Sequence, residues 1–284
     1  MTQTNAQLPK LIAEPVLRRA LQEDLADAGD LTAQLLHETG DGKALITARH
    51  AGILSGVEAI DYSAQLVDHR LNTQVYVQNG DTLEQGTIIA QVSGPWHSIF
   101  TAERTILNML QRMSGIATLT ASYVAETHGT KTRILCTRKT TPGLRAWEKQ
   151  AVRHGGGVNH RFGLHDGVML KDNHIAAHGS ITKALEKARE LFGPMVRIEI
   201  ECDDIEQVRE AVLGRADIIM FDNMSPHDVS RALDIVDGKS ITEASGGLAL
   251  EDIATMARTG VDYISVGKIT HSAPALDIGL DVPF

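Results

Sequence analysis

The residues best suited to chemistry lie in one stretch, between positions 131 and 174. This stretch holds nine lysines or arginines and only three acids, although the whole chain has a net charge of −9. A solvated surface with charged helix ends would explain four of these cations, Lys131, Arg145, Lys149 and Arg153. Four more stand at predicted strand ends or in a glycine-flanked loop, and they are Arg138, Lys139, Arg161 and Lys171. Arginine binds carboxylate or phosphate through two hydrogen bonds and lysine adds a point charge, so this set predicts a small, multiply anionic ligand.

Two acidic residues end later predicted strands, Glu201 in "RIEIEC" and Asp222 in "MFDNM". Carboxylates that converge among cations suggest a bound Mg²⁺, because this ion takes oxygen ligands and usually shares them with substrate phosphates. The alternative is a pair of salt bridges to Lys139 and Lys171, and both arrangements can hold at once.

The last two predicted strands end in "EASGG" and "ISVGKITHS", where small residues would let backbone N–H groups approach a phosphate. A Gly-Gly pair alone more often marks a turn. The segment "GKIT" is not a P-loop, because its lysine is not followed by serine or threonine and no glycine stands four residues before Gly267.

The segment "HGGGVNHRFGLHDG", residues 154–167, could form an oxyanion hole of the kind that esterases use. An esterase also needs a G-x-S-x-G turn, and no serine of the chain stands in that frame. For His154 and His165 we expect a structural role in the core. For His160 a core position and a ligand-facing position are both open.

Composition narrows the class of protein. The 284 residues are 43% hydrophobic and 22% charged, as in ordinary globular proteins, and the net negative charge argues against nonspecific binding to nucleic acid or membranes. Cys136 and Cys202 lie far apart in no metal-ligand spacing, which suggests a reducing compartment. No signal-peptide pattern and no apolar run near the ~20 residues of a membrane helix is found. We therefore expect a cytoplasmic protein.

The two parts of the chain show different patterns. Up to about residue 110, helical signals at Glu14–Leu25 precede apolar, glycine-containing segments that predict short strands, including two within residues 75–94. This piece is similar to the sandwich of lipoyl and biotin carrier domains, but residues 75–94 lack the lysine that a carrier presents. Residues 100–128 predict a long helix with a core or interface stripe, formed by Ile106, Met109, Leu110 and Met113.

From Lys131 onward, short β-branched runs alternate with helical segments, which predicts a parallel sheet. The strand candidates are "RILCTRK", "GVMLKDN", "VRIEIEC", "DIIMFDN", "SITEASG" and "YISVGKI". The helix candidates are "SITKALEKARELFG", "DDIEQVREAVLG", "SPHDVSRALDIV" and "ALEDIATMARTG". Nearly every strand begins apolar and ends polar, which favours an α/β barrel with its site at the C-terminal strand ends. Only six strands are found where a complete barrel has eight.

These blocks also carry a family resemblance. The segment "TRKTTPGLRAWEKQAVRHGGGVNHRFGLHDGVMLKDNH", with "EIE", "DNM", "EASGG" and "GVDYISVGKITHSAPALDIGL", resembles quinolinate phosphoribosyltransferases, also called nicotinate-nucleotide pyrophosphorylases (carboxylating). The similarity runs from "EDLADAGDLT" through "SGIAT" to the terminal "ALDIGL". The chain departs from the family at Lys268, where a small residue is expected, and this concerns the phosphate loop.

The resemblance implies an α/β protein of two domains. Residues 1–113 would form an N-terminal α/β sandwich joined by the C-terminal tail, residues 272–284, and residues 114–271 would form an incomplete α/β barrel of about seven strands. Family members are homodimers or larger homo-oligomers with shared active sites, so the same is expected here.

The resemblance further implies a reaction of quinolinate with 5-phosphoribosyl 1-diphosphate and Mg²⁺, which gives nicotinate mononucleotide, diphosphate and CO₂ in NAD biosynthesis. The residues that would face quinolinate are Arg138, His160, Arg161 and Lys171, with Arg104 from the neighbouring protomer. Those that would serve catalysis at the diphosphate, ribose and Mg²⁺ are Lys139, Lys171, Glu201 and Asp222. Those that would bind the 5-phosphate are Ser245, Gly246, Gly247, Gly267 and His271, and Thr137 and Lys268 complete the predicted substrate site.

Three other hypotheses stay open at this point. A pyrophosphorylase-like protein of molybdate-transport operons would share the fold with a different base substrate, and the complete set of cations disfavours it. A barrel aldolase would form a Schiff base on Lys171. A carrier or scaffold built on the sandwich would leave the charges of the barrel mouth without a purpose.

Overall fold

The computed structural model describes residues 7–283. Their contacts divide the chain into two compact units, and each is described by itself. The first comprises the described residues of Met1–Ala121, Thr140–Gly156 and Ile269–Phe284. The second comprises Ser122–Lys139 and Gly157–Lys268. Residues 140–156, which the sequence analysis assigned to the barrel, thus have most of their contacts in the first unit.

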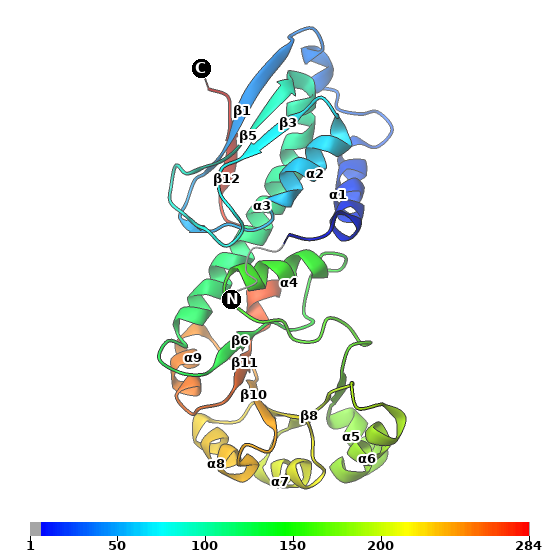
Figure 1. Ribbon diagram of the computed structural model, residues 1–284, viewed down its shortest axis with the longest axis vertical. Helices are drawn as coiled ribbons and strands as arrows, with labels where there is room; N and C mark the ends of the chain where they lie inside the picture. The colour runs from blue at the N-terminus through cyan, green and yellow to red at the C-terminus, as the bar shows by residue number, and fades with distance from the viewer. Residues whose placement is uncertain (1–6, 284) are drawn as a thin grey trace. The chain divides into compact units, whose positions relative to one another are not determined.

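The first unit contains an antiparallel sheet of strand order β12-β1-β5-β3. Its strands are β1 (Asp41–Ala48), β3 (Asn72–Val75), β5 (Ile88–Pro95) and β12 (Ile278–Asp281), beside a separate pair, β2 (Gly52–Ile53) and β4 (Thr82–Leu83). In β1, alternate residues are buried from Ala44 on, as expected for a strand with one face on the core. The C-terminal segment adds β12 to β1 and so supplies an edge of this sheet (Figure 1).

Helices α2 (Glu58–Val67) and α3 (Trp96–Ala125) pack on this sheet and bury its core, and the first unit also contains further helical segments (Figure 1). These segments are α1 (Lys10–Leu25), the 3₁₀ turn Ala33–Leu36 and α4 (Arg145–His154). The predicted helices near residues 14–25 and 100–128 are confirmed, and the predicted apolar stripe of α3 is buried. Helices α2 and α4 were not predicted, because glycines and charged residues around them hide their short buried faces.

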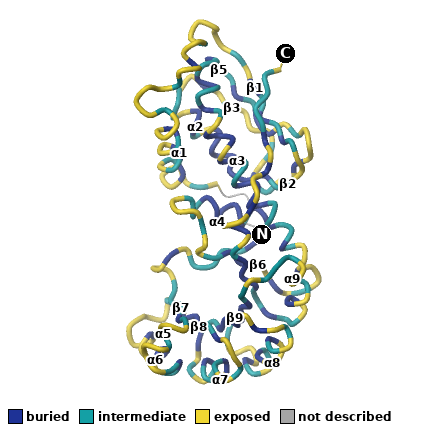
Figure 2. The backbone as a smooth tube through the Cα atoms, turned by 180° about the vertical axis from the view of Figure 1, so that it is seen from behind, coloured by how far each residue is buried: buried dark blue, intermediate teal, exposed yellow. Residues whose placement is uncertain are grey.

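The second unit contains a six-stranded parallel sheet of order β6-β11-β10-β9-β8-β7. The strands are β6 (Arg133–Leu135), β7 (Val168–Leu170), β8 (Ile198–Cys202), β9 (Ile218–Asp222), β10 (Ile241–Ser245) and β11 (Tyr263–Ser265). All six lie where the sequence predicted them. The helices are α5 (Asp172–His178), α6 (Ile181–Leu191), α7 (Ile205–Leu213), α8 (Pro226–Val236) and α9 (Leu250–Ala257). The short helix α10 (Lys268–His271) follows β11, and all of it but Lys268 is counted with the first unit. Figure 2 shows α5 to α8 outside the buried strands, as in an α/β barrel.

A seventh extended segment is reduced to one residue, Val158. It forms a parallel bridge with Leu135, and its N–H and C=O bond to Ile134 O at 2.8 Å and Cys136 N at 3.0 Å. Among the described residues, β7 pairs only with β8, so the barrel is open between β7 and the Val158 segment. The fold class predicted from the sequence, a sandwich plus an incomplete α/β barrel, is confirmed.

Candidate active site

The C-terminal ends of neighbouring barrel strands bring three predicted site residues together. Lys171 follows β7, Glu201 lies in β8 and Asp222 ends β9, and these strands are adjacent in the sheet. Lys171 Nζ donates to Glu201 Oε2 at 2.7 Å. Burial, followed by the charges of Glu201 and Asp203, raises the pKa of Asp222, while Lys171 opposes this rise. The salt bridge considered as an alternative for Glu201 therefore exists, within a cluster that carries both signs of charge.

The end of β10 lies against the backbone that follows β9. Asn223 has a left-handed backbone (φ +56°), its N–H donates to Ser245 O at 3.0 Å, and its side chain donates to Asp222 Oδ2 at 2.7 Å. A Cβ atom on Gly246 would lie 2.4 Å from Asn223 Oδ1 and 2.6 Å from its backbone nitrogen. Gly246 also has φ +112°, so both the close approach and the backbone angle require glycine here. The predicted phosphate role of Ser245, Gly246, Gly247 and Gly267 stays a prediction.

Two of the predicted quinolinate-facing cations lie near one another. Burial, followed by the positive charge of Arg138, lowers the pKa of Arg161. Arg161 Nη1 donates to Gly167 O at 2.8 Å, whereas its buried Nε has no hydrogen-bond partner among the described residues. Beside Arg138, Lys139 is exposed, and its N–H donates to Thr137 Oγ1 at 3.0 Å. A buried N–H group without a hydrogen-bond partner on an arginine is suited to donate to an anionic ligand.

Three further predicted residues lie on α3 and α10. Arg104 is exposed on α3, 3.6 Å from Glu103 Oε1. Lys268 is exposed at the first position of α10. His271, at the last position of α10, is also exposed, and its Nδ1 lies 2.6 Å from Ser272 Oγ. The donation of Arg104 to a neighbouring protomer and the phosphate contact of His271 stay predictions.

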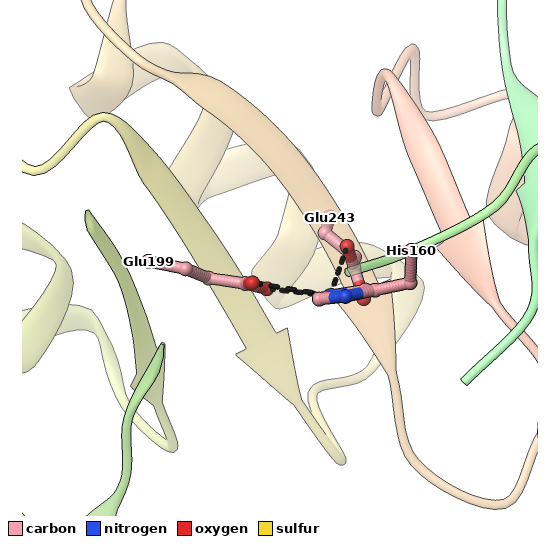
Figure 3. Close-up of side chains that lie close together, drawn as sticks. All are labelled: His160, Glu199 and Glu243. Carbon is pink, nitrogen blue, oxygen red and sulfur yellow. Dashed lines mark hydrogen bonds and ion pairs between the residues drawn. The ribbon is translucent and has the colours of Figure 1, made fainter. Parts of the chain in front are cut away.

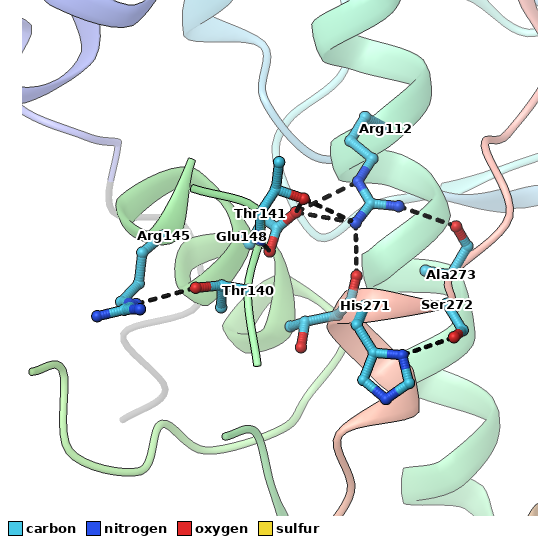
Figure 4. Close-up of polar contacts among 9 residues, drawn as sticks. Arg112, Thr140, Thr141, Arg145, Glu148, His271, Ser272 and Ala273 are labelled. Atoms are coloured by element: carbon cyan, nitrogen blue, oxygen red, sulfur yellow. Dashed lines mark hydrogen bonds and ion pairs between the residues drawn. The ribbon is translucent and has the colours of Figure 1, made fainter. Parts of the chain in front are cut away.

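Sequence reasoning missed the residues that hold the segment around His271 (Figure 4). Arg112 on α3 donates to the carbonyls of Thr270 and Ala273, which flank that histidine. The same guanidinium donates to Glu148 Oε1 at 2.9 Å, and this fully buried carboxylate also accepts from Thr141 Oγ1 at 2.8 Å. A charge-assisted network with a buried carboxylate is costly to break, so Arg112 is well suited to fix this backbone.

A buried cluster of His160, Glu199 and Glu243 lies inside the barrel (Figure 3). His160 Nε2 is 3.1 Å from Glu199 Oε2 and 3.6 Å from Glu243 Oε2. Burial, followed by the charge of Glu199, raises the pKa of Glu243 to about 8. In β8, Glu199 is two residues before Glu201 and so points to the same face of the strand. That spacing in "RIEIEC" was the signal that could have revealed Glu199.

The hydrogen bonds of His160 decide what this cluster can bind. Its ligand atoms and those of the two glutamates lie within 4.8 Å of one another, which is close enough to hold a metal ion. However, His160 Nδ1 accepts a hydrogen bond from the Arg161 N–H at 2.7 Å. Nδ1 is therefore unprotonated and Nε2 carries the proton of the neutral ring, so Nε2 has no lone pair for a metal. With both nitrogens engaged, His160 resembles the satisfied core histidine considered in the sequence analysis.

Comparison with known proteins identifies the family. Residues 30–114 match the model of the quinolinate phosphoribosyl transferase N-terminal domain, and residues 116–281 match the model of its C-terminal domain. The chain belongs to the quinolinate phosphoribosyltransferase family.

Individual members of the family match over nearly the whole chain. A probable nicotinate-nucleotide pyrophosphorylase (carboxylating) of Bacillus subtilis is 46% identical, covering 94% of this chain and 92% of the relative. The enzyme of that name from Mycobacterium leprae is 41% identical, covering 95% and 97%. The solved structure of the nicotinate-nucleotide pyrophosphorylase from Francisella tularensis has a TM-score of 0.94 and 38% identity, with 100% of both chains covered.

Two glycines of the segment "HGGGVNHRFGLHDG" are required for different structural reasons. A Cβ atom on Gly155 would lie 2.3 Å from Ala117 O and 2.7 Å from Thr120 Cβ, so glycine allows the end of α4 to contact α3. Gly156 has φ +85°, which lets the chain turn out of the helix.

Of four predictions about charged residues and histidines in and around this segment, two were right and two were wrong. His154 is buried with Nδ1 2.8 Å from Ser55 Oγ, which confirms its core role. His165 is exposed, because its loop runs over the surface beside the exposed Phe162. Lys149 is buried, so a solvated surface does not explain it, whereas Lys131 is exposed and 2.6 Å from Asp262, as that interpretation requires.

Proposed function

We propose that this chain is a decarboxylating quinolinate phosphoribosyltransferase, which makes nicotinate mononucleotide for NAD biosynthesis. The observation that carries the proposal is the cluster of Lys171, Glu201 and Asp222 at adjacent C-terminal strand ends of the barrel. In α/β barrels the chemistry takes place at that end. The names of the relatives at 41–46% identity state the same activity for those proteins.

The substrates explain the cations. Quinolinate carries two adjacent carboxylates, and 5-phosphoribosyl 1-diphosphate adds a monophosphate and a diphosphate. We assign Arg138 and Arg161 to the dicarboxylate. Arg138 is near enough for its charge to add to the effect of burial in lowering the pKa of Arg161, and the buried Nε of Arg161 has no hydrogen-bond partner among the described residues. Binding an anion between them would relieve their repulsion.

The transfer step separates charge at the ribose. Departure of diphosphate leaves a ribosyl centre with oxocarbenium character, as in glycoside cleavage. Lys139 and Lys171 would stabilise the leaving group, and the carboxylates of Glu201 and Asp222 would bind the ribose hydroxyls and favour the developing cation. The pyridine nitrogen of quinolinate attacks this carbon, so no covalent enzyme intermediate is needed.

The two acids at the C-terminal strand ends, Glu201 and Asp222, are suited to bind a magnesium ion. Both offer oxygen ligands. Burial and then the negative charge of Glu201 raise the pKa of Asp222, and a bound cation would offset the repulsion between the two carboxylates. We therefore propose that both residues contribute to a Mg²⁺ shell shared with the substrate. When bound, Mg²⁺ would neutralise charge on the diphosphate oxygens.

Decarboxylation follows from the first step. Once ribosylated, the pyridine nitrogen is cationic and accepts the electron pair released as the adjacent carboxylate leaves as CO₂. The ring carbon then takes a proton. The reaction therefore needs neither pyridoxal phosphate nor thiamine diphosphate, and the protein's part is to hold the ring among cations.

We further propose a homodimer or larger homo-oligomer in the cytoplasm, with Arg104 completing the site of the neighbouring protomer. The exposure of Arg104 supports this, and Cys136 and Cys202 are both buried free thiols, which suits a reducing compartment. No helix in residues 7–283 has the length and apolar character to cross a membrane.

The aldolase hypothesis is disfavoured by the geometry of Lys171. A Schiff base forms from a neutral amine, whereas Lys171 Nζ makes a 2.7 Å ion pair with Glu201. Borohydride trapping with candidate carbonyl compounds would detect such an intermediate, and we expect none.

The deciding experiment is incubation of the protein with quinolinate, 5-phosphoribosyl 1-diphosphate and Mg²⁺. We expect nicotinate mononucleotide, diphosphate and CO₂ in equal amounts, detected by chromatography. Omission of quinolinate, or nicotinate in its place, is the control for a different base substrate. Product from nicotinate but not from quinolinate would contradict the proposal.

A further inference from the structure

A cationic cavity lies at the end of the barrel opposite the proposed active site. Its volume is about 560 Å³, and it is lined by residues at the N-terminal ends of β6, β8, β9, β10 and β11. We call it the lower basin. Its charged lining residues are five cations, Lys131, Arg133, Arg197, Arg215 and Lys239, and two acids, Asp217 and Asp262. This cluster of positive charge is unusual in a chain of net charge −9. None of its residues has a role in the proposed reaction.

The arginines of the lower basin are not neutralised by the protein. Lys131 is 2.6 Å from Asp262, and Lys239 is 3.5 Å from Asp237. By contrast, Arg133, Arg197 and Arg215 form no ion pair with any residue in the described part of the chain. Three such guanidinium groups around one cavity repel one another, and an anion between them would turn this repulsion into attraction.

A second cavity, the inner chamber, adjoins the lower basin. Its volume is about 260 Å³, and Arg197, Ile241 and Tyr263 line both cavities. Arg161, whose buried Nε has no partner among the described residues, also lines the chamber. Its aliphatic walls include Leu135, Val158, Val168, Ile218 and Ile241. Together the two cavities fall in the size range of small-molecule sites, roughly 300–1,000 Å³.

From this arrangement we propose that the lower basin binds the di- or triphosphate chain of a small molecule, through Arg133, Arg197 and Arg215. Arginine forks match phosphate oxygens bidentately, which explains why arginines rather than lysines are the residues left unpaired. The chain could belong to a nucleotide, with its ring toward the inner chamber, or to an inorganic polyphosphate. The lower basin is separate from the proposed active site, because no residue that we assign to the reaction lines it. The inner chamber, by contrast, is lined by Arg161, which we assign to quinolinate.

The test is calorimetric binding of ATP and of inorganic triphosphate to the full-length chain. We expect both anions to bind the wild type. The double variant Arg133→Ser/Arg215→Ser should bind them at least about tenfold more weakly, because each substitution removes charged hydrogen bonds to the phosphate oxygens. The matched control is Arg209→Ser/Arg231→Ser, two exposed arginines on α7 and α8 outside the basin. Circular dichroism checks the fold, and Arg197→Ser provides a second basin variant.

Further arms locate the anion and identify its source. If the Lys139→Ala variant still binds both anions, the proposal is supported. If binding is lost in Lys139→Ala and kept in both basin variants, the anion binds at the catalytic end and the proposal is wrong. Tighter binding of ATP than of triphosphate identifies a nucleotide, and equal binding identifies the phosphate chain alone. Basin-dependent binding of a single-stranded RNA oligomer in preference to both small anions, or no binding of either anion, would also overturn it. All these readouts are independent of whether quinolinate is a substrate.

Discussion

Replacement of Glu243 by glutamine should stabilise the protein in a pH-dependent way. Glu243 is buried in β10, faced by His160 from the 158–167 loop, Glu199 from β8 and Ser265 from β11. Burial and the charge of Glu199 raise its pKa from 4.5 to about 8, although His160 and Ser265 partly offset this. Near pH 7 the folded chain therefore holds a proton that the unfolded chain has released. Raising the pH then favours the unfolded state, and stability that is complete below about pH 4.5 is lost progressively up to about pH 8.

The size of the effect follows from this linkage. Each pH unit between the two pKa values costs the folded state about 1.4 kcal/mol. Near pH 7 the free energy of unfolding of the wild type is therefore about 3 kcal/mol lower than near pH 4.5. The Glu243→Gln variant does not lose this stability, because an amide does not ionise in either state. We expect the variant and the wild type to be equally stable near pH 4.5, with the variant about 3 kcal/mol more stable near pH 7. The difference should level off above about pH 8.

Urea unfolding at several pH values, followed by circular dichroism, measures this difference. Tryptophan fluorescence is unsuitable, because Trp96 and Trp147 both belong to the first unit and do not report on the barrel. The control is Glu251→Gln on the exposed face of α9, which should show no pH-dependent gain. A difference that stays constant from about pH 5 to 8, or a variant less stable throughout, would show that Glu243 is ionised in the folded protein and refute the reasoning.

Four other predictions concern the proposed reaction and its support. Arg161→Ala should raise the KM for quinolinate by roughly 10- to 100-fold, the value of a charged hydrogen bond, with unchanged circular dichroism; unchanged kinetics would remove this residue from the site. Asp222→Asn should mainly lower kcat and weaken the dependence on Mg²⁺, and a wild-type rate would exclude its assigned role. Gly246→Ala should cost about 1–3 kcal/mol in urea unfolding, because an alanine is strained at φ +112° and meets the backbone after β9; a neutral result would show that the loop can move. Mixed Arg104→Ala and Lys139→Ala subunits should regain part of the lost activity, since a hybrid dimer contains one intact shared site, and failure to regain any would place each site within one protomer.

The parallel strands could be predicted because each is an apolar run with its own polar end. All six candidates from "RILCTRK" to "YISVGKI" are strands, and four helices between them lie as expected. The seventh segment could not be found, since a single bridge at Val158 leaves no pattern longer than one residue. Helix α4 escaped notice because its sequence, rich in charge, buries residues such as Lys149 and Glu148 that are usually solvated.

The catalytic candidates could be predicted for the same local reason. Lys171, Glu201 and Asp222 stand at strand ends, and parallel strands place such ends at one edge of the sheet. The residues that were missed act over long separations. Arg112 contacts Glu148, 36 residues away, and His160 contacts Glu199, 39 residues away. The spacing in "RIEIEC" could indicate which way Glu199 points, but no local pattern predicts the partner of either residue.

The sequence by itself determined the family, the order of strands and helices, and the identity of the charged groups at the strand ends. These depend on periodicity and residue type, which are properties of short segments. Only the tertiary structure decided which charges meet. Whether Glu243 keeps a proton, whether His165 is buried and whether three arginines share one cavity are set by burial and by distances between remote segments. Desolvation and Coulomb energies depend on those distances, and a one-dimensional pattern does not contain them.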